Sequence, residues 1–453
     1  MMSTSSYCRS SLLRWLLIAS LASTGAVLLS FSSVLRPGLI ADNHHSQGEA
    51  RFLEVPQIAW GLNNQKIALA RALLTARFLN RSLVLPLLSA SLTYKDTAHI
   101  QPLPFDRLFS LSRFNELCQG FVSISKLPAD ILQRNTAFNV TKGSGRRWTI
   151  ERDLDQLLQC RDPQIHRHAL LKISGKNPFL WHDHWPVLDY ARIFQCLVLE
   201  KGISNDVDRI VSKLRQVSLN LSETQGKVVL LQNSSLQHHR GARSTSPGNI
   251  HSDGYVAVHM RVEIDWMIHC KKTEERIKAR QGKVVNICSS REEILKRVSH
   301  IQGLHRPATV YLAVADVLLE DKNLLEGWED GLIPVEKKKL GLLKVYSKYP
   351  YLIQSALDYE ICLQSDIFVG NSFSTFSSLI ALERTLKMLA LKPADPCSGY
   401  AYPSYAYNLE TLNWGPPLWI TNLSDVSLQA ISYGTYQISC NTYSLMPGSL
   451  IQI

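Results

Sequence analysis

The chain has 453 residues, of which 45% are hydrophobic and 19% are charged, a balance that is typical of a globular protein with room for two domains. Its formal net charge is +11, but the basic residues are dispersed and form only short clusters such as Lys337 to Lys339. We therefore expect no nucleic-acid partner, and we expect a surface that favours anionic ligands.

The N-terminus carries an uncharged, largely apolar run at residues 15–35. Its length of about 21 residues is enough to cross a bilayer as a helix. Arg9 and Arg14 precede the run, so the positive-inside tendency predicts a type II topology. The sequence thus predicts a cytosolic tail at 1–14, a membrane anchor at 15–35 and a stem at 36–49, with the rest of the chain in the lumen. A cleaved signal peptide is the alternative, because Ser and Ala are frequent in the run.

Cysteines and glycosylation sequons also suit the secretory pathway. Eight of the nine cysteines follow the apolar run: Cys118, Cys160, Cys196, Cys270, Cys288, Cys362, Cys397 and Cys440. An even number in an oxidising compartment favours disulfides, although one sequence does not reveal their pairing. Sequons that permit N-glycosylation occur at Asn80, Asn139, Asn220, Asn233 and Asn422.

Strand-like apolar runs alternate with helix-length segments along the chain, which predicts the α/β class with parallel sheets. We predict strands at residues 82–88, 227–232, 255–261, 309–315 and 366–370. Residues 236–254 are rich in Ser, His, Arg and Gly and predict a linker. This linker would separate an N-terminal domain at 50–235 from a C-terminal domain at 255–453. The segment from Tyr400 onward lacks a long helical period and is expected to cross back onto the first domain.

The first motif with chemical potential is Gly61-Leu-Asn63-Asn64-Gln, which runs directly into an expected amphipathic helix. Glycine lets the backbone approach a ligand, and the Asn side chains could cap the helix while free N–H groups face an anion. A helix that is capped and nothing more is the alternative.

The second motif is the segment 255–266, where an apolar strand ends in charged residues. Side chains alternate along a strand, so His259, Arg261 and Glu263 would share one face. Ligands of doubly wound domains bind at the carboxyl ends of strands, where Arg261 could stabilise the charge of a leaving diphosphate. A structural ion pair of Arg261 with Glu263 or Asp265 is the alternative.

The third motif is the segment 366–377, which predicts a strand, a turn at Gly370 and a hydroxyl-rich helix start. The hydroxyls of Ser374 and Thr375, together with N–H groups at the helix start, suit a phosphate. Phe376 could line a pocket for a base or a sugar. An ordinary Ser/Thr cap would look the same locally.

Three further polar positions have competing interpretations. Asp316 follows a predicted strand directly and would hydrogen-bond a ribose or a guanine amino group, or else cap the next helix. Asp153 and Asp155 have the spacing of an Asp-x-Asp metal site, but the polar, helix-like stretch around them favours a solvated face, and we predict no metal. His182-Asp-His184 cannot all face one ion, and we interpret this segment as an aromatic loop for an acceptor.

Taken together, the three motifs resemble the hallmark regions of the protein O-fucosyltransferase family. The matching stretches are 61–65 leading to 79–86, His259-x-Arg261 after Val-Ala-Val, and 366–376. They occur in the family's order and span most of the proposed lumenal part.

The resemblance implies a GT-B architecture, with two Rossmann-like domains facing a cleft that holds GDP-fucose. It further implies inversion at the anomeric carbon, no cofactor, no required metal and a protein or glycan acceptor. Arg261 would be the catalytic residue. The substrate-binding residues carried over by motif are Gly61, Asn63, Asn64, His259, Arg261, Asp316, Ser374, Thr375 and Phe376.

The sequence leaves several alternatives open. The residues around Met260 and Val262 differ from the commonest form of the His-x-Arg motif, so another nucleotide sugar, as in rhamnosyl transfer to a cell-wall polysaccharide, is an alternative donor. A non-catalytic lumenal binding protein is a second alternative, against which the joint retention of His259, Arg261 and the Ser374-Thr375 loop argues. The catalytic base stays open between Glu263, Asp265 and a group near Asn63. We expect a single-pass Golgi membrane protein, with the ER as the alternative, because no Lys-Asp-Glu-Leu tail is present.

Overall fold

The computed structural model describes residues 50–90, 101–134, 137–143, 149–174, 185–232, 254–329, 331–399 and 401–438. The expected tail, anchor and stem, the loop at 182–184 and nearly all of the expected linker lie outside these residues. Within these ranges, no helix is long and apolar enough to span a membrane. Residues Ala50–Ile453 form one compact unit.

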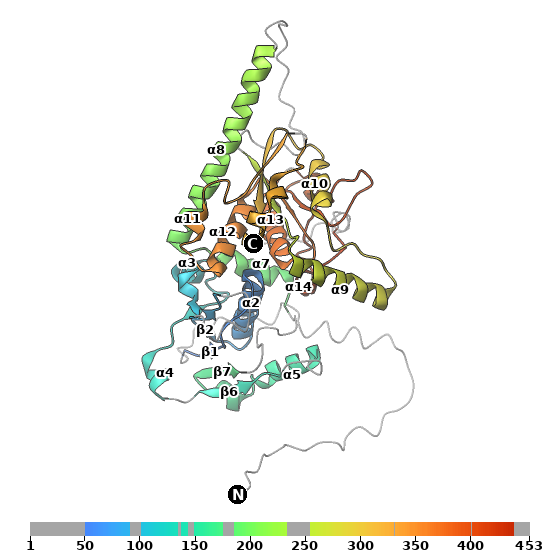
Figure 1. Cartoon of the computed structure of the whole chain (residues 1–453). Helices are drawn as coiled ribbons and strands as arrows, with labels where there is room; N and C mark the ends of the chain where they lie inside the picture. Colours follow the sequence, from blue (N-terminus) through green and yellow to red (C-terminus); the bar gives the residue numbers. More distant parts are fainter. Residues whose placement is uncertain are drawn as a thin grey trace. The chain divides into compact units, whose positions relative to one another are not determined.

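The first sheet has five parallel strands in the order β5-β2-β1-β7-β6, and Figure 1 labels β1, β2, β6 and β7 among them. Its strands are β1 (Phe52–Glu54), β2 (Ser82–Val84), β5 (Ile124–Ser125), β6 (Phe138–Thr141) and β7 (Leu170–Ser174), and β3 (Leu87–Leu88) pairs antiparallel with β4 (Leu103–Pro104). The helices of this half are α2 (Leu62–Phe78), η3 (Phe105–Arg107), α3 (Leu111–Leu117), α4 (Ala129–Arg134), α5 (Ile150–Gln159), α6 (Pro163–His166) and α7 (Val187–Cys196).

The second sheet also has five parallel strands, in the order β10-β9-β8-β11-β12. Its strands are β8 (Tyr255–His259), β9 (Ala308–Ala313), β10 (Leu332–Val335), β11 (Ile367–Gly370) and β12 (Ser404–Ala406). The remaining helices are α8 (Lys201–Gln232), α9 (Ile264–Gln281), α10 (Arg291–Ser299), η4 (Asp316–Glu320), η5 (Lys322–Leu325), α11 (Leu343–Tyr346), α12 (Tyr351–Gln364), α13 (Thr375–Ala390), η6 (Pro396–Ser398) and α14 (Gln429–Tyr433). The two all-parallel sheets confirm the α/β class.

Strand order in the second sheet creates a switch point. β9 and β10 lie on one side of β8, whereas β11 and β12 lie on the other, so the order reverses between β8 and β11. Ligands of open parallel sheets bind beyond the carboxyl ends of the strands at such a point.

Helix α2 lies in a core that both sheets share. One apolar cluster extends from Leu53 in β1 through Leu69 in α2 to Leu357 in α12 and Leu379 in α13. The prediction of an amphipathic helix is therefore wrong, because α2 packs against α7, α12 and α13 and is buried along nearly its whole length.

Two of the five strand predictions need correction. Residues 227–232 belong to α8, because a short apolar run in a continuing helix cannot be told from a strand by its pattern alone. The run 82–88 is divided between β2 and β3 at Leu85-Pro86, where proline supplies no N–H for the ladder. The other three strands are present with shorter carboxyl ends or shifted starts. Helix α8 packs on α12, β8 and β9 although it precedes the expected linker, and the domain boundary stays a prediction.

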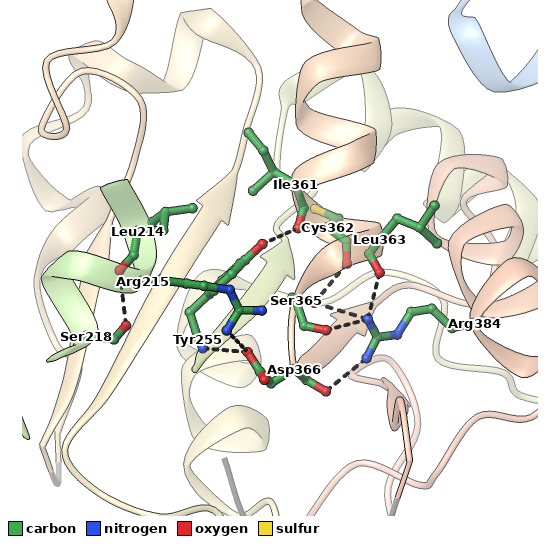
Figure 2. A network of polar contacts seen from close by, with 10 residues as sticks. All are labelled: Leu214, Arg215, Ser218, Tyr255, Ile361, Cys362, Leu363, Ser365, Asp366 and Arg384. Atoms are coloured by element: carbon green, nitrogen blue, oxygen red, sulfur yellow. Dashed lines mark hydrogen bonds and ion pairs between the residues drawn. The ribbon is translucent and has the colours of Figure 1, made fainter. Parts of the chain in front are cut away.

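A buried arginine holds the start of β11 in place, and Figure 2 shows this network. The Arg384 guanidinium donates to the carbonyls of Leu363, Ser365 and Asp366 at 3.1, 2.6 and 3.0 Å. It also donates to the carbonyl of Pro403 at 3.1 Å, and burial lowers its pKa to about 10. Helix α13 is thereby tied to the end of α12 and to the segments that begin β11 and β12.

The structure contains disulfides, as the cysteine count predicts. Cys118 pairs with Cys196 and Cys270 pairs with Cys288, and Cys397 is also disulfide-bonded. Not every cysteine pairs, since within the described ranges Cys160 and Cys362 are free and buried.

The C-terminal segment crosses back onto the first half, as predicted. The Asp425 carbonyl accepts a hydrogen bond from the Val187 N–H at the start of α7, at 3.0 Å. Arg71 of α2 donates to the Ser432 hydroxyl in α14 at 3.2 Å. The chain therefore links its two halves a second time after leaving the second sheet.

Candidate active site

The second and third motifs meet at the carboxyl edge of the second sheet. β8 ends at His259, which stands opposite Ala313 at the end of β9. On the other side, Val258 is in register with Val369, so the turn that follows Gly370 lies beside His259. This edge is the switch point where a ligand is expected.

His259 is fixed by two residues of α13. Its Nδ1 lies 2.8 Å from the Ser377 hydroxyl, and its ring stacks on Phe376 with centroids 4.3 Å apart. Burial, with a smaller effect of Arg261, lowers the pKa of His259 to about 3. The imidazole is therefore neutral at physiological pH, which suits a hydrogen bond to a ligand rather than an ion pair.

The turn between β11 and α13 requires glycine at position 370. A β-carbon there would collide with the side chain of Ser377. Ser377 in turn accepts a hydrogen bond from the Asn371 N–H at 3.2 Å. Our sequence reasoning missed Ser377, although it belongs to the same hydroxyl-rich run as Ser374 and Thr375 and lies one helical turn after Ser374.

The start of α13 offers a side-chain hydroxyl that the described chain does not use. Ser374 is the N-cap residue, yet its side chain makes no capping hydrogen bond. It is only 1% exposed, and in the part of the chain that the structure describes its Oγ has no hydrogen-bond partner. The interpretation as an ordinary cap is therefore wrong, and the hydroxyl is available to an anion at the helix N-terminus.

The Arg261 guanidinium is accessible and only loosely paired. It is 33% exposed, and its Nε lies 3.9 Å from Glu263 Oε2. It also lies over the Trp266 ring, 4.7 Å from the centroid. A cation–π contact orients the guanidinium and leaves its N–H groups for a ligand. The ion pair with Glu263 that the sequence offered as an alternative is present only as a long contact.

Glu263 does not continue the strand face that the sequence suggested. β8 ends at His259, and Glu263 is instead the N-cap residue of α9. Burial raises the pKa of its carboxyl group. Asp265, in the first turn of α9, is exposed.

The segment after α9 is bonded both to α9, which contacts Arg261, and to the turn that precedes α13. The Cys270–Cys288 disulfide ties α9 to this segment, and Glu274 accepts the Ile287 and Cys288 N–H groups at 2.6 and 2.9 Å. The Ile287 carbonyl in turn accepts a hydrogen bond from Asn371 at 2.8 Å. Neither this brace nor the role of Trp266 was predicted, because both depend on contacts outside the local motif.

Asp316 lies after β9 as expected, but its local role differs. It is the first residue of η4, whose N-cap is Ala315, so the capping alternative is wrong. Its exposed carboxylate pairs with the buried ammonium of Lys337, which lies 3.7 Å from Asp358 as well. A contact between Asp316 and a nucleotide stays a prediction.

The first motif begins α2, with Gly61 as the N-cap residue and no side-chain cap. The predicted capping by Asn is therefore wrong. Asn64 is exposed, whereas Asn63 is 5% exposed and its Oδ1 has no hydrogen-bond partner among the described residues. Gln65, which we did not single out, connects the start of α2 to the segment after β3. Its side chain exchanges hydrogen bonds of 2.9 and 3.0 Å with the backbone of Ser89.

The Asp-x-Asp segment is a helix, α5, but the prediction of a solvated face is wrong for Asp153. This carboxylate is buried and pairs with Lys142, while Asp155 is exposed. Over the described ranges, no cluster of His, Cys, Asp and Glu is arranged to hold a metal ion.

Comparison with known proteins gives the chain a family. Residues 53–387 match the family described as GDP-fucose protein O-fucosyltransferase. O-fucosyltransferase 23 of Arabidopsis thaliana is 49% identical over 92% of this chain and 93% of its own length. O-fucosyltransferase 9 of the same plant is 21% identical over 70% of this chain and 55% of its own length.

Solved structures show a more distant likeness. POFUT1 in complex with GDP-fucose aligns with 16% identity and a TM-score of 0.45, over 74% of this chain and 95% of that chain. The fucosyltransferase NodZ from Bradyrhizobium aligns with 13% identity and a TM-score of 0.31, over 71% and 89% of the two chains. The family match over most of the chain and the relative at 49% identity decide the assignment: the chain belongs to the GDP-fucose protein O-fucosyltransferase family and is an O-fucosyltransferase-like glycosyltransferase.

Proposed function

We propose that this protein transfers fucose from GDP-fucose to a hydroxyl group of a protein or glycan acceptor, with inversion and without a metal ion. One observation carries the proposal. His259, Arg261 and the free Ser374 hydroxyl at the start of α13 lie at one edge of the second sheet, at its switch point. Family membership supports the choice of donor.

The donor diphosphate would bind between Arg261 and the N-terminus of α13. A guanidinium can hold phosphate oxygens with two parallel hydrogen bonds. The helix start adds N–H groups, the Ser374 and Thr375 hydroxyls and the positive end of its dipole. Asp316 and Phe376 would contact the nucleoside, and Gly61, Asn63 and Asn64 would contact fucose or the acceptor.

Arg261 would act on the leaving group. In the transfer, the bond from the anomeric carbon to the β-phosphate oxygen breaks and its electron pair leaves with GDP. The acceptor oxygen forms its bond from the opposite face and passes its proton to a base, for which Glu263, Asp265 and a group near Asn63 are the candidates. The guanidinium stabilises the charge that develops on the phosphate, as a metal ion does in other glycosyltransferases.

We further propose that the two sheets belong to two Rossmann-like domains that face a cleft, and that the protein is a type II protein of the Golgi membrane. The apolar run at 15–35 and the basic residues before it support the topology. The disulfides support a lumenal location for the part that begins at residue 50.

Calorimetric titration of the full-length protein with GDP, UDP and ADP in EDTA tests the donor site. We expect selective GDP binding that Arg261→Ala weakens by about 10- to 100-fold, since a hydrogen bond to a charged group contributes about 1.5–3 kcal/mol. We also expect Arg261→Ala to lower the rate of GDP release from GDP-fucose.

Arg77→Ala is a matched control, because Arg77 lies at the C-terminal end of α2, is 31% exposed and pairs with Asp189 of α7. It should leave GDP affinity unchanged. A preference for UDP would redirect the donor assignment, and folded wild-type protein that binds no nucleotide would refute the proposal.

A further inference from the structure

A buried ion pair joins the helix that follows the first motif to the helix that follows the third. Lys66 lies in the first turns of α2, three residues after Asn63, and its Nζ is 2.7 Å from Glu383 Oε1 in α13. Lys66 is 5% exposed and Glu383 is 8% exposed. Burial of two charges is costly unless their geometry is well defined, so this pair favours one relative position of the two helices.

Tyr359 of α12 completes the pair. Its hydroxyl donates to the same Glu383 oxygen at 2.6 Å, and its ring lies below the Lys66 ammonium, 3.9 Å from Nζ to the centroid. The carboxylate oxygen therefore has two donors, and the ammonium contacts both an anion and an aromatic face. Three helices are held by one polar cluster, which we define as Lys66, Tyr359 and Glu383.

The cluster continues into the nucleotide side of the candidate site. The Tyr359 ring packs edge-on against Phe376, with centroids 5.4 Å apart. Phe376 is the residue on which His259 stacks. A shift of Tyr359 would therefore move Phe376 and, through it, the His259 ring. A shift of Lys66 would move Asn63 and Asn64, which lie within one turn of it in α2.

We propose that Lys66, Tyr359 and Glu383 are positioning residues, which hold the start of α2 at Gly61–Asn64 in register with His259 and Arg261 without touching the substrates. The inference rests on the proposed function, in which these two regions act in the same transfer. A small error in such a register has a large effect, because misplacement of reacting groups by about 1 Å can lower a rate about 100-fold.

The test compares Lys66→Met with Lys66→Met/Glu383→Gln in the full-length protein. The single variant leaves a buried carboxylate without its ion-pair partner, so both thermal stability and kcat for GDP release from GDP-fucose should fall, the latter by about 100-fold. The double variant contains no buried charge at these positions and keeps an acceptor for Tyr359. Its stability should recover, while kcat should stay low. GDP affinity should remain close to wild type in both variants.

Two more variants separate positioning from general damage. Tyr359→Phe removes only the hydroxyl and should fold, with kcat lowered by about 10-fold because the start of α2 loses one of the contacts that position it. Lys142→Met is the matched control, because Lys142 forms a buried pair with Asp153 that lies wholly within the first half. It should lower stability and leave kcat unchanged.

The possible outcomes are distinct. Recovery of kcat together with stability in the double variant would show that the cluster is only structural, and would overturn the inference. Wild-type kcat in Lys66→Met, or in Tyr359→Phe should the former fail to fold, would overturn it as well. Absence of GDP binding by the folded wild type would refute the proposed function and this inference with it, whereas wild-type binding with unaffected variants refutes the inference alone.

Discussion

Glu360 is a carboxyl group whose surroundings disfavour its negative charge. It follows Tyr359 in α12, and burial together with the nearby Glu383 carboxylate raises its pKa to about 7. Between the ordinary pKa of 4.5 and this value, the folded protein binds a proton that the unfolded chain releases. The free energy of unfolding therefore falls as pH rises through this window.

Glu360→Gln should remove that dependence, because the amide stays neutral. At pH 8 we expect the variant to exceed the wild type in free energy of unfolding by about 1 to 3 kcal/mol, and at pH 4.5 we expect the two proteins to be nearly equal. Urea unfolding at both pH values measures the difference. Glu275→Gln, on the exposed face of α9, is the control; an equal gain at both pH values would contradict the assignment.

Local pattern could predict some site residues and not others. An apolar strand that ends in charge is readable in one sequence, and so the position of His259 at the end of the strand, with Arg261 just beyond it, could be predicted. The partner of His259 could not, because Ser377 lies 118 positions later in the chain. The burial of Asp153 could not be predicted either, since its ion-pair partner Lys142 lies just after β6, outside the helix, and a polar helix gives no sign of it.

At the scale of elements, α9 is held by its disulfide in a way that concerns the site. Trp266, in the first turn of α9, contacts the Arg261 guanidinium with its ring. Cys288 lies next to Ile287, whose carbonyl accepts a hydrogen bond from Asn371. The covalent link from Cys270 to Cys288 thus supports both sides of the proposed phosphate site.

Cys270→Ser/Cys288→Ser should lower both stability and ligand affinity. The bond closes a loop with a sequence separation of 18, and loops of about this size give roughly 3 kcal/mol in the chain-entropy description. Urea unfolding measures this loss, and calorimetry should show weaker GDP binding because Arg261 and Asn371 lose their support.

The other described disulfide is the natural control. Cys118→Ser/Cys196→Ser opens a loop with a sequence separation of 78 in the first half. It should destabilise the protein without weakening GDP binding. If both pairs of substitutions weakened GDP binding equally, the brace would have no special relation to the site.

Elements were predictable where their length and flanks were distinctive. The strands at β8, β9 and β11 have turn or polar residues at their carboxyl ends, and they were found within two residues. The apolar run at 227–232 also follows polar residues and Gly226, yet α8 begins at Lys201 and continues through it. Only the packing of the whole helix decides between the two structures.

At the scale of the molecule, the two sheets share one apolar core. The cluster that contains Leu53 of β1 also contains Leu357 of α12 and Leu428 near the C-terminus. The buried ion pair of Lys66 and Glu383 crosses the same junction. Neither half could therefore expose its surface without a large loss of buried apolar area.

We expect the folded body to unfold in one cooperative transition. Scanning calorimetry should give a single peak, and circular dichroism and tryptophan fluorescence should report the same midpoint. Separation of the midpoints would show that the halves unfold independently. Such a result would support the predicted linker at 236–254 as a boundary between two independently stable domains.

The arginine at the start of β11 has a consequence for robustness. All four backbone acceptors of Arg384 are carbonyl oxygens, at Leu363, Ser365, Asp366 and Pro403, and a substitution at those positions changes a side chain but leaves the carbonyl in place. The donors, in contrast, all come from one guanidinium. Substitution of Arg384 alone would remove all four hydrogen bonds at once, so the junction of α12, α13, β11 and β12 depends on this one side chain.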